Sequence, residues 1–156
     1  MEYFPGLATK EETAAAVGRI EAHFARYGYG LWAVTIEGVA DFAGFIGICN
    51  YSTPVPFSPC VEIGWRLAAE HWGHGYATEG ARAALDFGFH RLALDEIVSF
   101  TAVENERSRR VMEKLGMTYD SADDFDHPSV PEGHPVRRHV LYRIKRAAPP
   151  DATGMY

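Results

Sequence analysis

The stretch EHWGHGYATEG, residues 70–80, decides how the rest of the sequence is interpreted. Gly73 and Gly75 stand directly before an amphipathic run, and glycine at such a place removes the Cβ atom that would keep a bulky group away from the backbone. The first amides of a helix have no partner within the helix, and the helix dipole favours an anion beside them. The stretch therefore predicts a strand-to-helix turn that binds phosphate groups.

The glycine spacing separates this turn from two other phosphate-binding loops. Gly73, Gly75 and Gly80 do not fit the pattern G-x-G-x-x-G, and no Gly-Lys-Ser/Thr follows, as a Walker loop requires. A dehydrogenase and a nucleotide kinase are therefore disfavoured. A glycine-rich helix start without a ligand remains the alternative.

Hydrophobic periodicity and end signals predict the elements on either side of the turn. We expect helices over 10–26, 75–92 and 105–116, strands over 31–37, 41–51, 60–67 and 96–103, and two further strands within 117–128 and 136–144 around a long loop. Thr9 with Glu12 has the spacing of a capping box for the first helix, and Asn105 is the expected N-cap of the third. This order predicts a mixed α/β (α+β) domain over 1–146, followed by a tail over 147–156.

Composition narrows the class of protein. The chain has 156 residues, 47% of them apolar, which suffices for one compact domain. Its net charge of −6 argues against sequence-independent binding to nucleic acid. No apolar run approaches the ~18–20 residues that span a bilayer, and no signal peptide is apparent, so a cytoplasmic location and no membrane partner are expected. Cys49 and Cys60 lie in apolar segments and are expected to be reduced.

Two longer segments carry a family resemblance. VEIGWRLAAEHWGHGYATEGARAAL, residues 61–85, and VENERSRRVMEKLGM, residues 103–117, resemble the Gcn5-related N-acetyltransferases (GNAT), most of all their ribosomal-protein N-terminal acetyltransferase branch. The resemblance covers about 31–145. It implies a mostly antiparallel central sheet flanked by helices, an acyltransferase activity, and acetyl-coenzyme A (acetyl-CoA) as cosubstrate.

The resemblance also assigns the cosubstrate site. The family's coenzyme loop aligns with residues 72–77, where Trp72 stands in place of the usual Gln or Arg. By this resemblance, backbone amides hold the pyrophosphate, and pantetheine lies beside the strand that ends at Arg66 and Leu67. The loop residues so assigned are Gly73, His74, Gly75, Tyr76, Ala77 and Thr78. Asn105 resembles the family asparagine that contacts the pantetheine arm.

Acetyl transfer to an amine needs a base for the amine and a proton for the leaving thiolate. Glu62 alternates with apolar neighbours on a strand, and burial there would raise its proton affinity, which suits a general base. Resemblance supports this role; a structural glutamate is the alternative. Many family members have a tyrosine as thiolate donor where this chain has Met112, whereas Ser108 matches the serine of the ribosomal-protein branch. Ser108 is therefore the candidate donor, and an ordinary capping serine is the alternative.

The acceptor is less well defined. The resemblance implies a primary amine, either of a small molecule or of a protein N-terminus. Asp123, Asp124 and Asp126 are candidates to attract it, against the alternative of a solvated acidic turn. Neither this acidic run nor His71 with His74 has the ligand spacing of a structural zinc motif, and acetyl transfer requires no metal, so none is expected.

The first part of the chain departs from the family. A strand and a helix usually precede the MEYFPG region, residues 1–6, and this sequence has neither. The strand at 31–37 is then expected to be a sheet edge that a second copy of the chain, or the N-terminal segment, would cover. This departure, and Met112 in place of the donor tyrosine, keep a second hypothesis open: the chain could be a non-catalytic acyl-CoA-binding module. A third hypothesis is an enzyme that transfers longer acyl chains.

Overall fold

The computed structural model describes residues 8–147. Within this part of the chain, helix α1 (Lys10–Tyr27) precedes a meander of three strands, β1 (Leu31–Ile36), β2 (Ala40–Tyr51) and β3 (Cys60–Leu67). Helix α2 (Tyr76–His90), strand β4 (Glu96–Ala102) and helix α3 (Glu106–Lys114) follow. The last elements are β5 (Thr118–Tyr119), β6 (Phe125–Asp126) and β7 (Arg138–Lys145), and 3₁₀ turns lie at Ala69–His71, Ser121–Asp123 and Pro135–Arg137.

The local end signals act as the sequence predicts. Thr9 and Glu12 form both hydrogen bonds of a capping box at α1, and Gly28 ends that helix with a φ of 75°. Asn105 caps α3 by accepting a hydrogen bond from the main-chain N–H of Ser108. The three predicted helices and the strands of the meander are thereby confirmed, with ends that differ by one or two residues.

The predicted strand within 117–128 is wrong as a single element. It is divided into β5 and β6, each of two residues, by the turn at Ser121–Asp123. The side chain of Asp120 accepts a hydrogen bond from the main-chain N–H of Ala122, which stabilises a turn where the strand would continue. Beyond residue 147, the expected tail lies outside the described residues.

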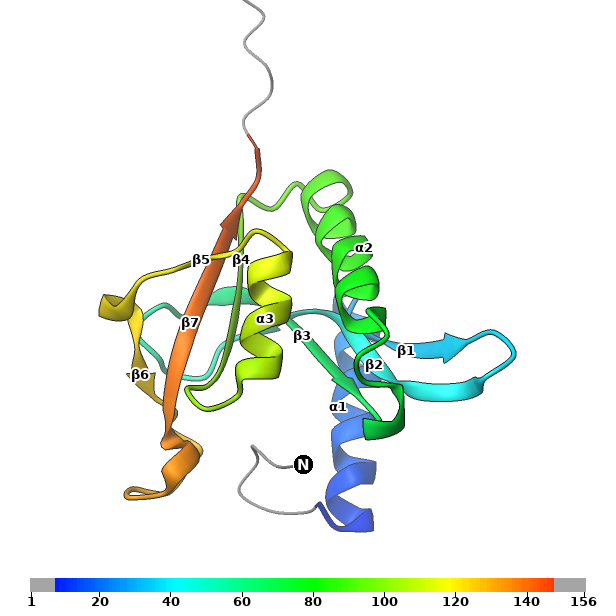
Figure 1. Cartoon of the computed structure of the whole chain (residues 1–156), viewed down its shortest axis with the longest axis horizontal. Helices are drawn as coiled ribbons and strands as arrows, with labels where there is room; N and C mark the ends of the chain where they lie inside the picture. Colours follow the sequence, from blue (N-terminus) through cyan, green and yellow to red (C-terminus); the bar gives the residue numbers. More distant parts are fainter. Residues whose placement is uncertain (1–7, 148–156) are drawn as a thin grey trace, which may run out of the picture.

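The sheet is mixed and divides between β3 and β4. Its described strands follow the order β1-β2-β3-β4-β7-β5, with β6 also paired to β7. All neighbours are antiparallel except β3 and β4, which are parallel and register, within residues 8–147, only at Glu62 with Val98. Figure 1 shows β3 and β4 diverging from each other below that point, with α2 and α3 in front of the sheet. The sheet therefore opens between these two strands.

The main core lies between the sheet and α2. Ile48, Ile63 and Ile97 are fully buried there, together with Ala81 and Leu85 of α2. The opposite face of the sheet carries a separate apolar cluster. It contains Val98, Phe125 and Leu141, with Val55, Phe57, Cys60 and Phe100 packed against them. Residues alternate between the two faces along each strand, so Glu62 shares the face of this second cluster.

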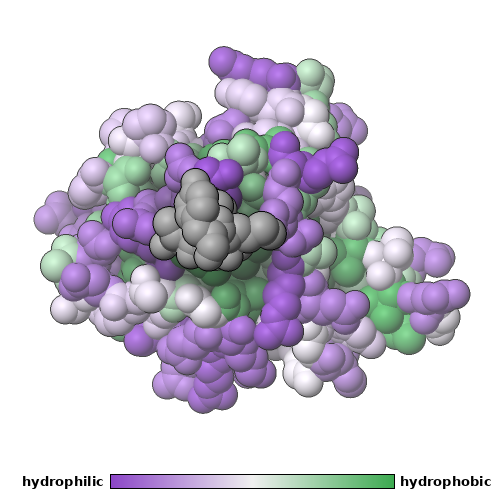
Figure 2. Space-filling view, turned by 90° about the horizontal axis from the view of Figure 1, so that it is seen from above, coloured by the Kyte–Doolittle hydropathy of each residue, from purple (hydrophilic) through white to green (hydrophobic). Residues whose placement is uncertain are grey.

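Strand β1 is the terminal strand of the described sheet, as expected. Helix α1 contacts this region through its last turns, where Phe24 packs edge-on against Trp32. In Figure 2 the apolar, green side chains at the right gather over the β1–β2 hairpin, where Val39 and Phe42 are each 65% exposed. In the part of the chain described, none of the helices is both long and apolar enough to cross a membrane.

Candidate active site

The turn between β3 and α2 has the geometry of an anion-binding helix start. Gly73 and Gly75 have φ values of 80° and 87°, a region that favours glycine, and a Cβ at either position would meet no atom of the described chain within 4 Å. Gly75 is the N-cap of α2, and no side chain among residues 8–147 caps that helix. Its first amides are therefore free to bind a ligand from the open side.

A cavity of about 850 Å³ begins at this turn and continues between β3 and α3. The candidate thiolate donor Ser108 lines it, as do most of the predicted cosubstrate residues: Arg66, Leu67, Gly73, Gly75, Tyr76, Ala77, Thr78 and Asn105. His74 lies beside it in a second recess of about 500 Å³, which Arg82 and Lys114 also line. Glu62 is not among the residues that line this cavity, although Arg66, which lies on the same face of β3 four residues further along, does line it. The candidate base therefore lies along β3 from the cavity rather than within its lining.

Several basic residues at the cavity were not predicted. Arg107, Arg110 and Lys114 project from α3 into its lining, and the guanidinium of Arg107 lies 4.7 Å from the ring centre of Trp72. Trp72 in turn donates a hydrogen bond from Nε1 to the carbonyl of Leu67 at 2.9 Å. A cation thus stands next to the position where the family has Gln or Arg. The spacing of three and four residues along α3 is the sequence signal that would have found this cationic face.

Ser108 and Asn105 form a compact hydrogen-bonded pair at the cavity. Asn105 Nδ2 donates to Ser108 Oγ at 3.2 Å and to Thr101 Oγ1 at 2.8 Å. Because Ser108 Oγ accepts from Asn105, the hydroxyl proton of Ser108 is left for another acceptor. Met112, at the position of the family tyrosine, is only 1% exposed and belongs to the core. Of the two, only Ser108 can therefore reach a ligand in the cavity.

Glu62 lies where the sheet begins to open. It pairs with Cys49 of β2 on one side and with Val98 of β4 on the other. Although the residue keeps some surface exposure, its carboxyl group is surrounded by protein, and this burial raises its pKa from 4.5 to about 8. No hydrogen bond or ion pair holds Glu62 within residues 8–147. A carboxyl group of this kind can accept a proton at neutral to alkaline pH.

The two cysteines flank Glu62 and are free thiols, as expected. Burial, followed by the charge of Glu62, raises the pKa of Cys49 to about 12 and that of Cys60 to about 11. Both thiols therefore stay protonated at neutral pH and are poor nucleophiles.

Most of the carboxylate oxygens of the acidic segment are paired within the described chain, and Asp124 Oδ1, which is buried, has no partner there. Asp123 is ion-paired with Arg143 at 2.8 Å, and Asp126 lies 3.3 Å from Arg138 and 3.8 Å from Arg137. Asp124 accepts a hydrogen bond from the hydroxyl of Tyr119. These contacts use the carboxylates to fix the segment between β5 and β7, so they are weaker candidates for binding a cationic amine than the sequence suggested.

Comparisons with known proteins agree with this architecture. A family model described as an acetyltransferase (GNAT) domain matches residues 1–118. The uncharacterized N-acetyltransferase YnaD of Bacillus subtilis is 37% identical over 145 residues, which cover 92% of this chain and 79% of that protein.

Solved structures show the same fold. A GNAT-family acetyltransferase from Bacillus anthracis has a TM-score of 0.71 and 29% identity, over 93% of this chain and 80% of that one. RimL, a ribosomal L7/L12 alpha-N-protein acetyltransferase solved in complex with coenzyme A, has a TM-score of 0.69 over 89% of this chain and 74% of that one. Its identity of 18% supports a shared fold alone.

Proposed function

The chain belongs to the GNAT family of acetyltransferases, as the resemblance of residues 61–85 and 103–117 predicted, and we propose that it acetylates a primary amine by direct attack on acetyl-CoA in a ternary complex. One observation carries this proposal. A buried carboxyl group without a partner in the described chain, Glu62, lies at the register position where β3 and β4 separate, and a cavity of about 850 Å³ opens along β3.

The residues of the cavity fit acetyl-CoA, which supplies the activated acetyl group. The amides at the start of α2 face open space beyond Gly73 and Gly75, which suits a pyrophosphate. Arg107, Arg110 and Lys114 add positive charge along the same lining. Because the whole chain carries a net charge of −6, this concentration of cations is a local feature that favours a polyanionic ligand.

Glu62 acts as the general base in this proposal. An amine attacks only when it is neutral, so the proton of the ammonium group must leave; its N–H bond breaks and an O–H bond forms on Glu62, directly or through water. The raised pKa of Glu62 brings its proton affinity closer to that of an amine than an exposed carboxylate would have. Ser108 donates a hydrogen bond to the departing thiolate from the other side of the sheet.

The acceptor is an amine-bearing small molecule or a protein N-terminus. It approaches from the face that carries Glu62, since α2 and α3 cover the opposite face. Both classes of acceptor therefore belong in the same screen.

A screen of amine acceptors with detection of released thiol tests the proposal. We expect release of coenzyme A with at least one amine, and a fall on the order of 10²–10⁴-fold in turnover for Glu62→Gln with coenzyme affinity unchanged. Tight binding of acetyl-CoA without release for any amine would instead identify a non-catalytic binding module, which the buried Met112 makes the second candidate.

A further inference from the structure

Tyr51 reaches across the strand that carries Glu62. It is at the end of β2 opposite Cys60, and its ring centre lies 5.0 Å from that of Phe100 on β4. Because β3 lies between β2 and β4, this contact carries the ring of Tyr51 across β3 on the face of Glu62. Cys60, the cross-strand partner of Tyr51, is two residues from Glu62 on the same face of β3, so the ring of Tyr51 lies over the part of β3 that carries Glu62.

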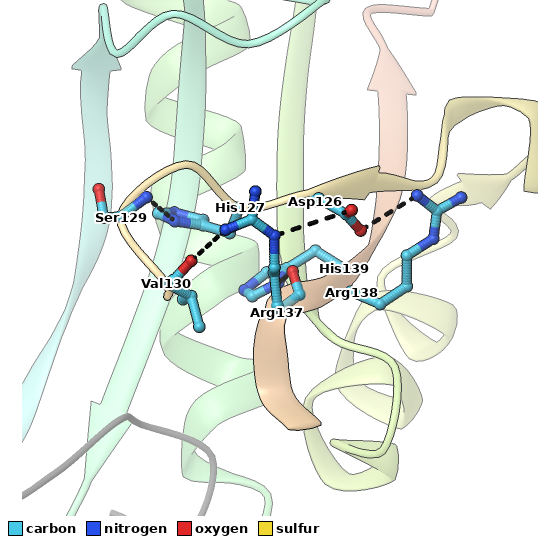
Figure 3. A network of polar contacts seen from close by, with 7 residues as sticks. All are labelled: Asp126, His127, Ser129, Val130, Arg137, Arg138 and His139. Carbon is cyan, nitrogen blue, oxygen red and sulfur yellow. Dashed lines mark hydrogen bonds and ion pairs between the residues drawn. The ribbon is translucent and has the colours of Figure 1, made fainter. Parts of the chain in front are cut away.

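His127 holds the hydroxyl of Tyr51 in one orientation. Its Nδ1 accepts a hydrogen bond from the main-chain N–H of Ser129 at 3.2 Å, as Figure 3 shows. A neutral imidazole that accepts at Nδ1 carries its proton on Nε2. Nε2 lies 3.3 Å from Tyr51 Oη, so His127 is the donor in that hydrogen bond. Burial, followed by the neighbouring His139, lowers the pKa of His127 and keeps the ring neutral.

The loop around His127 is well fixed. Asp126, the preceding residue, binds both Arg137 and Arg138, and Arg137 also donates a hydrogen bond to the carbonyl of Val130 (Figure 3). These contacts join β6 to the start of β7. The position of the imidazole relative to Tyr51 is therefore set by the fold.

The hydroxyl proton of Tyr51 consequently points away from His127. Because His127 donates to Oη, the phenol oxygen is the acceptor in that hydrogen bond, and its own O–H is left to donate.

The side of Glu62 offers few other donors. Within residues 8–147, the titratable and charged groups near Glu62 on this side of the sheet are Cys49 and Tyr51 on β2, Cys60 on β3, Glu96 on β4, Arg143 and His139 on β7, and His127 after β6. Arg143 is ion-paired with Glu96 and Asp123, His139 is hydrogen-bonded to the carbonyl of Arg137, and a thiol is a weak donor. Tyr51 is therefore the strongest donor among these groups whose proton is not already used.

We propose that Tyr51 is a positioning residue for Glu62: its hydroxyl, oriented by His127, donates a hydrogen bond through one water to the ionised carboxylate and so keeps the base ready to accept a proton. A water is required because Tyr51 and Glu62 are not in direct hydrogen-bond contact. The inference rests on the proposed function, since it assumes that Glu62 is the base. Tyr51 and His127 thereby gain a role that packing alone would not give them.

The test is the pH dependence of kcat/KM with one amine whose release of thiol has been established. Loss of the hydrogen bond from Tyr51 destabilises the ionised carboxylate of Glu62 and so raises its pKa. For Tyr51→Phe we therefore expect the rise of kcat/KM on the acid side of the pH profile to move to higher pH by about one unit. Tyr119→Phe removes a hydroxyl that serves Asp124 instead and is the matched control, with an unchanged pH profile. An unchanged pH profile in a folded Tyr51→Phe enzyme overturns the inference.

A second pair of variants tests the role of Tyr51 even if Tyr51→Phe folds poorly. His127→Gln places an amide donor near the position of Nε2, whereas His127→Asn keeps an acceptor near Nδ1 and loses the donor to Tyr51. We expect the acid side of the pH profile of His127→Gln to stay close to that of wild type, and that of His127→Asn to shift towards higher pH. Equal profiles for the two variants overturn the inference. If Glu62→Gln turned over as fast as wild type, the proposed function would fail instead, because Glu62 would not be the base. That outcome is independent of the results for Tyr51.

Discussion

Replacement of Glu62 by glutamine should make the protein more stable and less active, to an extent that depends on pH. In the folded chain the pKa of Glu62 is raised from 4.5 to about 8 by burial. The folded state therefore binds this proton more tightly than the unfolded state. Its stabilising effect is complete below about pH 4.5 and is lost as the pH rises to about 8.

The size of the effect follows from the two pKa values. Each unit of separation corresponds to about 1.4 kcal/mol, so wild type should lose roughly 4 kcal/mol between pH 5 and pH 9 through this group. This figure is an upper limit because Glu62 keeps some exposure. Glutamine does not titrate, and every other group titrates in both proteins. The difference in free energy of unfolding between Glu62→Gln and wild type should therefore increase by up to that amount across this range.

Urea denaturation of both proteins at pH 5, 7 and 9, followed by circular dichroism, measures the difference. Burial of the glutamine amide can change the free energy of unfolding by an amount that does not depend on pH. Such a change shifts the difference between the two proteins equally at pH 5, 7 and 9, so the pH dependence of the difference is unaffected. A difference that is constant from pH 5 to pH 9 would refute the argument that Glu62 is a buried carboxyl group with raised proton affinity. The same variant should lose turnover. The ionised form of Glu62 would then be the form that activity requires and also the form that destabilises the folded state.

Three further outcomes test the remaining parts of the site. Gly75→Val should lower coenzyme A affinity more than tenfold in calorimetry, above ~1.4 kcal/mol, because it fills the open side of the turn and strains a φ of 87°; unchanged affinity in a folded variant would exclude this turn as the pyrophosphate site. Ser108→Ala should slow thiol release less than Glu62→Gln does, and alkali should not restore the rate, since a thiol with a pKa near ~8.5 leaves fairly easily as an anion; recovery at high pH would contradict a role at the thiolate. The edge strand β1 should be covered, by a second copy that light scattering detects as a dimer or by the N-terminal segment, whereas a monomer with fast amide exchange along residues 31–37 would show that the edge is tolerated in water.

Local signals made the helices and the meander predictable. A capping box at Thr9, a left-handed glycine at position 28 and an N-cap at Asn105 each act within a few residues, so the sequence contains the whole cause. The geometry of the turn before α2 was equally predictable, because its two glycines precede a strongly amphipathic run.

Contacts between distant residues were not predictable in the same way. Arg107 reaches Trp72 only because α3 packs near the start of α2, and Tyr51 meets His127 only because β6 folds back over β4. No spacing in the sequence reports such a pair. The pairing of Asp123 and Asp126 with arginines of β7 and the turn before it likewise appears only once the chain is folded, and it changed the interpretation of the acidic segment.

The division of the sheet between β3 and β4 also affects the order in which the protein folds. Strands β1, β2 and β3 pair with their nearest neighbours in the chain, whereas β4 pairs with β7 across the whole segment that contains α3, β5 and β6. The segment between β4 and β7 forms a longer loop, and closing it costs more chain entropy before the strand pairing can stabilise it. The meander should therefore form first, so that Ile48→Val slows refolding in stopped-flow measurements. Leu141→Ala should mainly accelerate unfolding, because β7 joins the sheet after the rate-limiting step.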